Sequence, residues 1–286
     1  MKDYPKPPFP KQSQPFPGVT SKMDPRPDHG EDSYKGSGRL AGKKAIVTGG
    51  DSGIGLAVAI AFAREGADLL IVHLPSETED AATCKRLIEE AGRKAVMAPG
   101  DITEASFRED IVARAVDELG GLDILVNNAG YQKPFKEFLD IPLEEWTKAF
   151  DTNVTAMFHL TQLAVARMKP GASIINTASV NSKDPTGMLL PYATTKGAIA
   201  NFTVGLAELI GEKGIRVNAV APGPIWTPFI PAGMPPEAVE TFGSKTPLGR
   251  PGQPAELASA YVMLASDESS YTSGAMITVA GGKAVV

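Results

Sequence analysis

Short runs of apolar residues recur along the chain, and longer segments with a helical spacing of apolar positions separate them. Short apolar runs favour strands that are buried on both faces. The runs predicted to be strands are residues 44–47, 69–72, 95–98, 124–126, 173–177, 216–220 and 276–279. The segments predicted to be helices are residues 54–65, 77–91, 104–119, 146–168, 192–211 and 256–265. Because strands that alternate with helices form βαβ units, we expect an α/β protein with a parallel sheet covered by helices on both faces.

Two proline-rich stretches interrupt this alternation. Residues 1–38 hold eight of the 24 prolines, and proline fixes φ and removes backbone donors, so this stretch is predicted to be extended. It is either a free tail or an arm that packs on the domain or on a neighbouring subunit, with Phe9 and Phe16 as candidate anchors. We therefore divide the chain into a Pro-rich N-terminal extension, residues 1–38, and one α/β domain, residues 39–286. The second stretch, residues 222–236, is predicted to be a long functional loop.

The composition narrows the classes of function. With 43% hydrophobic and 21% charged residues, the chain is typical of soluble globular proteins. A net charge of −5 argues against a nucleic-acid partner, which requires a basic face. Cys84 is the single cysteine, so no disulfide forms within the chain, and we interpret it as a bystander thiol. The sequence starts without an apolar signal core and has no run long enough to cross a bilayer, so we expect a cytoplasmic protein with no membrane partner.

A glycine-rich loop, Thr48-Gly49-Gly50-Asp51-Ser52-Gly53-Ile54-Gly55, joins the first predicted strand to the first predicted helix. Its glycines suit a tight turn, the close approach of a pyrophosphate, and close packing of the helix on the strand. The free N–H groups and the positive dipole end of the helix would face the phosphates. The alternative is a glycine-rich turn without a ligand. Because the loop lies between a strand and a helix, as the binding mechanism requires, we predict a dinucleotide site.

Further polar residues are predicted to reach the same edge of the sheet. Asp101 and Ile102 follow the third predicted strand, where the Asp101 carboxylate could bond an adenine amino group. The segment Asn127-Asn128-Ala129-Gly130 follows the fourth predicted strand. In open α/β sheets the ligand lies outside the carboxyl ends of the strands, so these residues and the glycine loop are expected to share one site.

Tyr192 and Lys196 stand at i, i+4 at the start of a predicted helix, which puts both on one face. Tyrosine has an ordinary pKa of about 10, and we expect the Lys196 ammonium to lower it toward the range useful for acid–base catalysis. Ser179 ends the preceding strand, and its hydroxyl could hold a substrate oxygen near the phenol. Asn153 falls in a separate helix, where its amide could hold a water that links to Lys196. A Tyr–Lys pair alone is common on surfaces, but its position after Ser179 and the glycine loop makes it a candidate active site.

These motifs resemble the short-chain dehydrogenase/reductase family from about Leu40 to the C-terminus. The residues that carry the resemblance are 48–55, 127–130, Asn153, Ser179, Tyr192, Lys196 and Pro222-Gly223. The resemblance implies a Rossmann-like, doubly wound parallel sheet of about seven strands in a three-layer α/β/α fold. It implies an oxidoreductase that moves a hydride between NAD(P) and a carbonyl or alcohol, with Tyr192 as acid/base. It assigns Lys196 to the nicotinamide ribose and to lowering the Tyr192 pKa, Ser179 to substrate orientation, and Asn153 to a proton relay.

The resemblance also implies a set of cofactor contacts, no metal and a homotetramer. The expected cofactor-binding residues are Gly49, Asp51, Ser52, Gly53, Ile54, Gly55, His73, Asp101, Ile102, Asn128, Ala129, Gly130, Tyr192, Lys196, Pro222, Gly223, Ile225 and Thr227. The Pro-rich extension, His73-Leu74-Pro75, residues 221–228 and residues 265–271 look like a subgroup of the family. Members of that subgroup are often called glucose/ribitol dehydrogenase-like proteins, general stress proteins or aldehyde reductases.

Substrate and cofactor choice leave alternatives open. The residues expected on the substrate side are Tyr131, Gln132, Asn181, Met188, Leu189, Trp226 and Phe229, a mix that suits a small aldehyde or ketone as well as a sugar or polyol. No lysine or arginine closely follows the second strand, and Asp51 would repel a 2′-phosphate, which favours NAD(H) over NADP(H). Yet His73 occupies the place of the acidic residue that usually bonds the 2′-hydroxyl, so we expect a modest preference for NAD with NADP usable. The competing hypothesis is a nucleotide-binding stress or scaffold protein with vestigial redox activity.

Overall fold

The computed structural model describes residues 3–283, which contain one parallel sheet of seven strands in the order β3-β2-β1-β4-β5-β6-β7. The strands are β1 (Lys44–Thr48), β2 (Asp68–His73), β3 (Ala95–Pro99), β4 (Ile124–Asn127), β5 (Ser173–Thr177), β6 (Arg216–Pro222) and β7 (Met276–Val279). The α-helices are α1 (Gly53–Arg64), α2 (Thr78–Glu90), α3 (Ala105–Arg114), α4 (Leu143–Phe150), α5 (Ala156–Val165), α6 (Leu190–Ile210), α7 (Phe229–Gly233), α8 (Pro236–Glu240) and α9 (Ala255–Ala265). The strand order reverses between β1 and β4, so the Rossmann-like, doubly wound fold is confirmed.

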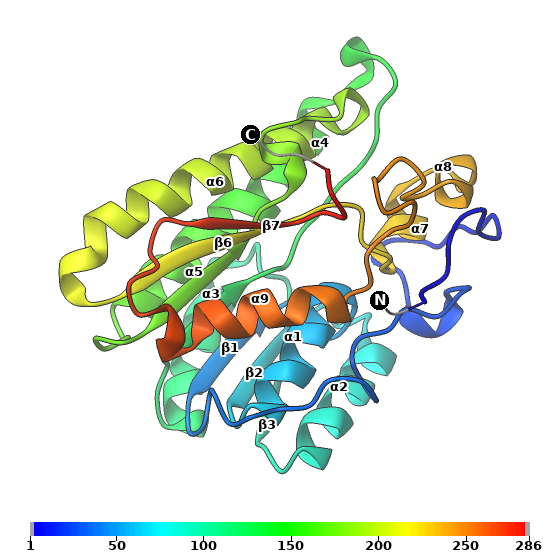
Figure 1. Cartoon of the computed structure of the whole chain (residues 1–286). Coiled ribbons are helices and arrows are strands. Elements are labelled where there is room, and N and C mark those ends of the chain that lie inside the picture. The colour runs from blue at the N-terminus through cyan, green and yellow to red at the C-terminus, as the bar shows by residue number, and fades with distance from the viewer. Residues whose placement is uncertain (1–2, 284–286) are drawn as a thin grey trace.

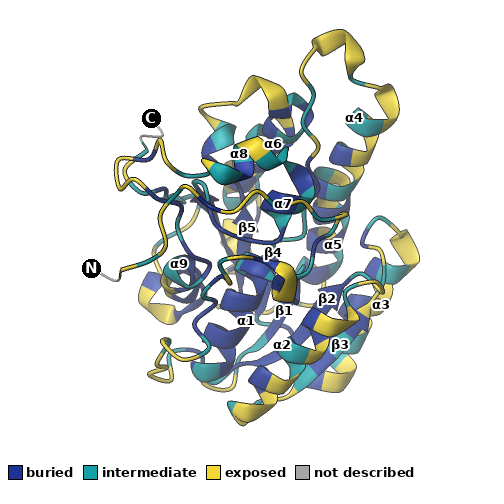
Figure 2. Cartoon of the chain, turned by 90° about the vertical axis from the view of Figure 1, so that its right-hand side faces the viewer, coloured by how far each residue is buried: buried dark blue, intermediate teal, exposed yellow. Residues whose placement is uncertain are grey.

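Helices cover both faces of the sheet and give the molecule three layers (Figure 1). Against one face pack α1, α2 and α9, with Phe62 and Tyr261 fully buried. Against the other pack α3 and α5, with Ile111 and Leu160 fully buried. β2 and β6 are buried at every position, which explains why the apolar residues of β2 run without a break from Leu69 to Val72 rather than alternating. Figure 2 shows these buried strands inside a shell of helices that expose their outer faces.

Two predicted helical regions are interrupted by π-helical turns. The region predicted at 146–168 consists of α4, a π-helical turn at Asp151–Thr155, and α5. The region predicted at 104–119 consists of α3 followed by a π-helical turn at Ala115–Leu119. Such turns are frequent at functional sites, and the first of them contains the candidate residue Asn153.

The proline-rich stretch after β6 is more regular than predicted. It contains α7 and the beginning of α8, so the prediction of a loop without secondary structure at 222–236 was wrong. Pro236 lies at the first position of α8, where the missing backbone N–H has no intrahelical partner to lose. Proline therefore starts this helix rather than preventing it.

The N-terminal extension runs beside α7 and α8 (Figure 1). The Phe9 N–H donates to the carbonyl of Glu240 at 2.9 Å, and the Phe9 ring lies 4.3 Å from the ring of the fully buried Trp226. Phe16 remains 40% exposed and meets Tyr131 edge-on at 5.3 Å. Of the two candidate anchors, Phe9 is thus the buried one, and the described part of the extension packs on its own chain.

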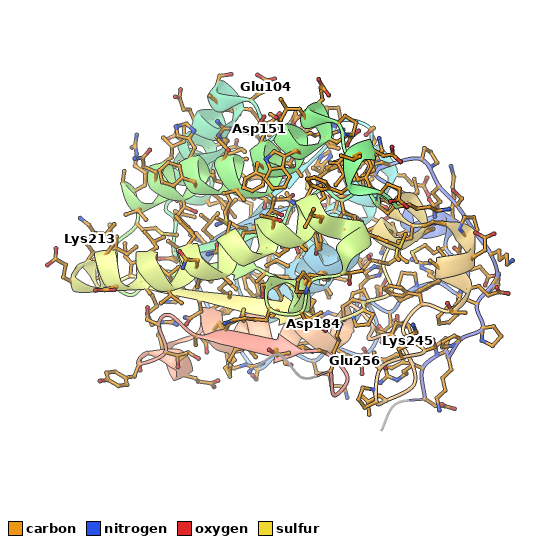
Figure 3. The ribbon with its side chains drawn as sticks, turned by 90° about the horizontal axis from the view of Figure 1, so that it is seen from above. Glu104, Asp151, Asp184, Lys213, Lys245 and Glu256 are labelled. Carbon is orange, nitrogen blue, oxygen red and sulfur yellow. The ribbon has the colours of Figure 1, made fainter. Side chains whose placement is uncertain are left out.

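Charged side chains of the domain contact tyrosines near both ends of the described extension. Near its start, the Arg250 guanidinium lies 5.1 Å over the Tyr4 ring and pairs with Glu256, which is labelled in Figure 3. Near its end, the buried carboxylate of Glu65 accepts hydrogen bonds from the Tyr34 hydroxyl and from the Arg39 guanidinium, both at 2.6 Å. Burial would raise the pKa of Glu65, but the hydrogen bonds from Arg39 and Tyr34 lower it to about 2.

Candidate active site

A cavity of about 590 Å³ lies at the carboxyl ends of the strands, where the sequence places the candidate residues. Its wall consists of the glycine loop, the segments that follow each of the strands β2, β3, β4, β5 and β6, and the start of α6. The predicted site residues that line it are Gly49, Asp51, Ser52, Gly53, Ile54, His73, Asp101, Ile102, Asn128, Ala129, Gly130, Ser179, Tyr192, Lys196, Pro222, Gly223, Ile225 and Thr227. Gly55 lies behind the glycine loop, and Asn153 lines a smaller neighbouring cavity.

The glycine loop has glycine at the positions where a side chain would collide with neighbouring atoms, and this leaves room for a dinucleotide. Gly53 has a φ of +51°, and a Cβ on Gly55 would lie 1.9 Å from the carbonyl oxygen of Gly49. The Asn128 amide donates hydrogen bonds to the carbonyls of Thr48 and Gly49, at 3.1 and 3.0 Å, and so braces the loop. Because α1 begins at Gly53, the free N–H groups of its first turn adjoin the loop. These features fit the pyrophosphate of a nicotinamide dinucleotide.

Two further candidate residues line the cavity at neighbouring strands: His73 is the last residue of β2, and Asp101 follows the end of β3. His73 Nδ1 lies 2.9 Å from the carbonyl oxygen of Leu74, beside β2. Asp101 Oδ1 accepts hydrogen bonds from the backbone N–H and the hydroxyl of Thr103, both at 2.8 Å. Asp101 is exposed and keeps Oδ2 available, so the adenine contact expected of it stays a prediction.

The structure brings Ser179, Tyr192 and Lys196 together at the middle of the cavity. The Tyr192 hydroxyl is hydrogen-bonded to Ser179, whose Oγ also accepts from the backbone N–H of Asn181 at 3.1 Å. Lys196 is 3% exposed, and its Nζ donates to the carbonyl oxygen of Thr177 at 2.7 Å. The same Nζ lies 5.4 Å from the centroid of the Tyr192 ring. A phenol, a hydroxyl and an ammonium thus meet within one wall of the cavity.

The titration behaviour of this group differs from what the sequence predicts. Burial raises the pKa of Tyr192 to about 12, and the hydrogen bond with Ser179 offsets this only in part. Burial also lowers the pKa of Lys196 to about 8. The expectation that Lys196 holds the pKa of Tyr192 below its ordinary value was therefore wrong for the site as it stands, because removal of the phenol from water dominates.

Comparison with known proteins agrees with this geometry. The family model described as enoyl-(acyl carrier protein) reductase matches residues 49–284. General stress protein 39 of Bacillus subtilis is 50% identical over 286 residues, which cover 100% of this chain and 99% of that protein. A short-chain dehydrogenase from Burkholderia cenocepacia, solved in complex with NADP, matches with a TM-score of 0.80 and 33% identity over 85% of this chain and 98% of that one. The chain belongs to the short-chain dehydrogenase/reductase family.

Its relatives also support the class of reaction. Glucose and ribitol dehydrogenase of Daucus carota is 42% identical over 283 residues, covering 97% of this chain and 97% of that protein. The resemblance to the glucose/ribitol dehydrogenase and general stress protein subgroup is thereby confirmed. The dehydrogenase is an NAD(P)-dependent oxidoreductase of this family.

The side-chain amide of Asn153 makes three hydrogen bonds within the protein. Its Nδ2 donates to the Tyr131 carbonyl and to the Thr195 hydroxyl, at 2.9 and 3.0 Å, and its Oδ1 accepts from the Tyr131 N–H at 2.7 Å. The π-helical turn also places Asn153 beside a cavity of about 10 Å³, which Lys196 and Asn127 line as well. That volume suits about one water molecule. Asn153 thus braces the segment after β4, and the proton relay expected of it stays a prediction.

The substrate side of the dehydrogenase differs from the sequence prediction at two positions. Tyr131, Gln132, Asn181, Leu189 and Phe229 line the cavity as expected. Met188 does not, because it is 42% exposed on the outside of the turn before α6. Trp226 does not either: its indole Nε1 donates to the carbonyl of Pro25 in the extension at 2.7 Å. Trp226 was taken for a cavity residue because a sequence does not show which side chains the extension covers. Met188 was taken for one because a sequence does not show to which side of a turn a residue points.

Several residues of the cavity wall were not predicted, among them Phe16, Pro17, Glu77 and Lys148. Phe16 stood out only as an aromatic residue between prolines, and Glu77 only as the start of a helix. Among residues 3–283, no cluster of three or more His, Cys, Asp or Glu could hold a metal ion. Within the same range, no helix combines the length and the apolar character needed to cross a membrane.

Proposed function

We propose that the dehydrogenase transfers a hydride between the nicotinamide ring and the carbonyl or alcohol carbon of a small aldehyde, ketone, sugar or polyol, with Tyr192 as the acid/base. The observation that carries this proposal is the Ser179–Tyr192 hydrogen bond beside Lys196, in a cavity that continues to the glycine loop. The nicotinamide supplies the hydride or accepts it. The protein's part is to position the substrate oxygen and to exchange one proton with it.

Each residue has a distinct part in this proposal. The Ser179 hydroxyl holds the substrate oxygen next to the phenol of Tyr192. In reduction Tyr192 donates its proton to that oxygen, and in oxidation the phenolate accepts it. Lys196 places a positive charge near the phenol and binds the nicotinamide ribose. Asn153 and the small cavity beside Lys196 support a proton relay through a water.

The proposed substrate class follows from the cavity wall. Leu189 and Phe229 are apolar, whereas Gln132 and Asn181 offer a few directed polar groups. This mixture accommodates a small carbonyl compound, and the name of the carrot relative adds sugars and polyols to the candidates. We further propose that the protein is a homotetramer, which the family resemblance supports. We propose a cytoplasmic location, because a single cysteine forms no disulfide within the chain.

We propose a modest preference for NAD, with NADP usable. The support is the absence of a lysine or arginine close after β2, together with the carboxylate of Asp51 in the glycine loop. The Burkholderia relative was solved with NADP, which supports NADP as a usable cofactor.

The test combines a substrate screen with one variant. A survey of aldehydes, ketones and polyols, followed by NAD(P)H absorbance, should identify a turned-over substrate. Tyr192→Phe should then lose at least about two orders of magnitude in kcat with the dissociation constant of the cofactor unchanged, the usual scale of acid–base catalysis. Near-normal turnover in this variant would refute the role of Tyr192. No turnover of any compound by the wild type would favour the alternative of a nucleotide-binding stress protein with vestigial chemistry.

A further inference from the structure

The N-terminal extension forms part of the cavity wall. Phe16 and Pro17 line the main cavity together with residues of the domain. The Phe16 ring meets the Tyr131 ring at 80°, with the centroids 5.3 Å apart, which is a favourable edge-to-face contact. The Phe16 side chain nevertheless stays 40% exposed. An aromatic ring that lines a cavity and keeps this exposure offers apolar surface to a ligand.

The backbone on each side of Phe16 is attached to a different element of the domain. Before it, the Gln14 N–H donates to the carbonyl of Pro231 in α7 at 2.9 Å. After it, the N–H and the hydroxyl of Thr20 donate to Asp80 Oδ2 in α2, at 3.0 and 3.1 Å. The segment 14–20 therefore runs from α7 to α2, and its place on the domain does not depend on the Phe16 ring alone.

These contacts put Phe16 beside the substrate side of the cavity. Tyr131, which the Phe16 ring meets, is bonded to the Asn153 amide through its backbone N–H and its carbonyl, at 2.7 and 2.9 Å. Phe229 belongs to the same short helix as Pro231, and its ring centroid lies 6.4 Å from that of Tyr192. Tyr131 and Phe229 both line the cavity, and the extension is attached next to each of them.

We propose that Phe16 is a specificity-determining residue, which contacts the part of the substrate remote from the carbonyl and favours an apolar group there. The inference rests on the proposed function and deepens it, because it adds the N-terminal extension to the substrate site. A carbonyl oxygen at Ser179 and Tyr192 fixes one end of the substrate. The Phe16 ring would then contact the other end when the substrate is long enough to reach it.

The polar groups next to Phe16 are engaged with one another. The Glu145 carboxylate accepts from the Tyr131 hydroxyl and pairs with Lys133, each at 2.6 Å. Lys148 Nζ lies over the Tyr131 ring at 4.3 Å and over the Phe16 ring at 6.0 Å. The positive charges of both lysines also lower the pKa of Glu145. The Phe16 ring needs no polar partner, so it is the surface here that gains most from contact with an apolar group.

Binding of unreactive carbonyl mimics tests the inference without turnover. The probes are acetamide, butyramide, hexanamide and octanamide, titrated by calorimetry into the enzyme saturated with its reduced nicotinamide cofactor. In the wild type the dissociation constant should fall as the chain grows. Phe16→Ala should raise the dissociation constants of hexanamide and octanamide about tenfold, the scale of a lost apolar contact in a pocket. That of acetamide, which is too short to reach the ring, should stay within about threefold.

Two control variants separate contact with the probe from an effect on the fold. Phe16→Leu keeps an apolar side chain, so its dissociation constants for the longer amides should stay within about threefold of the wild type. Phe138→Ala removes the same atoms from a side chain that is 74% exposed and outside the cavity wall, and it should change none of them. Limited proteolysis of Phe16→Ala should match the wild type, because the contacts of Gln14 and Thr20 remain.

Three results would overturn the inference and leave the dehydrogenase function standing. The first is unchanged binding of the longer amides by Phe16→Ala. The second is an equal loss for acetamide and octanamide, which would indicate a general loosening of the site. The third is tighter binding of the longer amides, because the ring would then limit the size of the substrate rather than bind it. A wild type that binds none of the amides would overturn the inference together with the proposed class of substrate.

Discussion

Replacement of Phe9 by alanine should loosen the N-terminal extension from α7 and α8. The ring is 5% exposed and packs in a cluster with Trp226, Ile230 and Val239. Emptying a buried phenylalanine site costs about 3–5 kcal/mol. A typical hydrogen bond contributes about 0.5–1.5 kcal/mol, which is the scale of the bond between the Trp226 indole and the Pro25 carbonyl. The loss of Phe9 therefore outweighs any one of the polar contacts that would remain.

Limited proteolysis, thermal melting and tryptophan emission measure the effect. If the extension and the domain unfold together, the melting temperature should fall by roughly 6–20 °C, since 1 kcal/mol shifts a chain near this size by about 2–4 °C. If the extension opens by itself, cleavage within residues 3–38 should accelerate and the emission of Trp226 should shift to the red. Phe138→Ala, at a side chain that is 74% exposed, removes the same atoms and should change none of these readouts. A Phe9→Ala variant that matches the wild type in all three would show that the extension is only a tail.

Two further predictions concern acid stability and the segment after β6. Because the folded pKa of Glu65 is about 2, against an ordinary value of 4.5, its stabilising effect is present above pH 4.5 and is lost as the pH falls toward 2. Glu65→Gln should therefore be less stable than the wild type at pH 7 in urea unfolding, and the difference should shrink at pH 3; a constant difference would contradict the argument. Residues 225–244 should exchange backbone hydrogens more slowly after addition of cofactor with a substrate analogue, because this segment is expected to close over the substrate. Unchanged exchange would count against a closing segment.

The sheet could be predicted because its strands carry their own signal. β2 is buried along its whole length, and the apolar run that marks it, residues 69–72, is unbroken. β6 is also buried throughout, although Asn218 interrupts its apolar residues. The glycine loop was recognisable for a related reason, since Gly55 leaves no space for a side chain against Gly49. Local physical constraints of this kind appear in the sequence as fixed residue types at fixed spacings.

The rest depended on contacts between distant parts of the chain. Trp226 looked like a residue of the cavity wall, but the extension, 201 residues earlier, covers it through Pro25. Asn153 looked like a helical residue, but its hydrogen bonds with Tyr131 accompany a π-helical turn. The pKa of Tyr192 also depends on how closely several elements enclose it. None of these features has a local spacing from which it could be predicted.

The opposite pKa shifts of Tyr192 and Lys196 have a common cause and a chemical consequence. Burial disfavours the charged form of each group, which for the phenol is the deprotonated state and for the amine is the protonated one. With a pKa of about 12, Tyr192 keeps its proton at neutral pH, and this is the form that donates to a carbonyl oxygen. With a pKa of about 8, Lys196 is still mostly an ammonium there, so its positive charge is available to the oxygen that develops negative charge. If Tyr192 acts as proposed, the resting site is therefore prepared for reduction at neutral pH, and oxidation, which needs the phenolate, should accelerate as the pH rises.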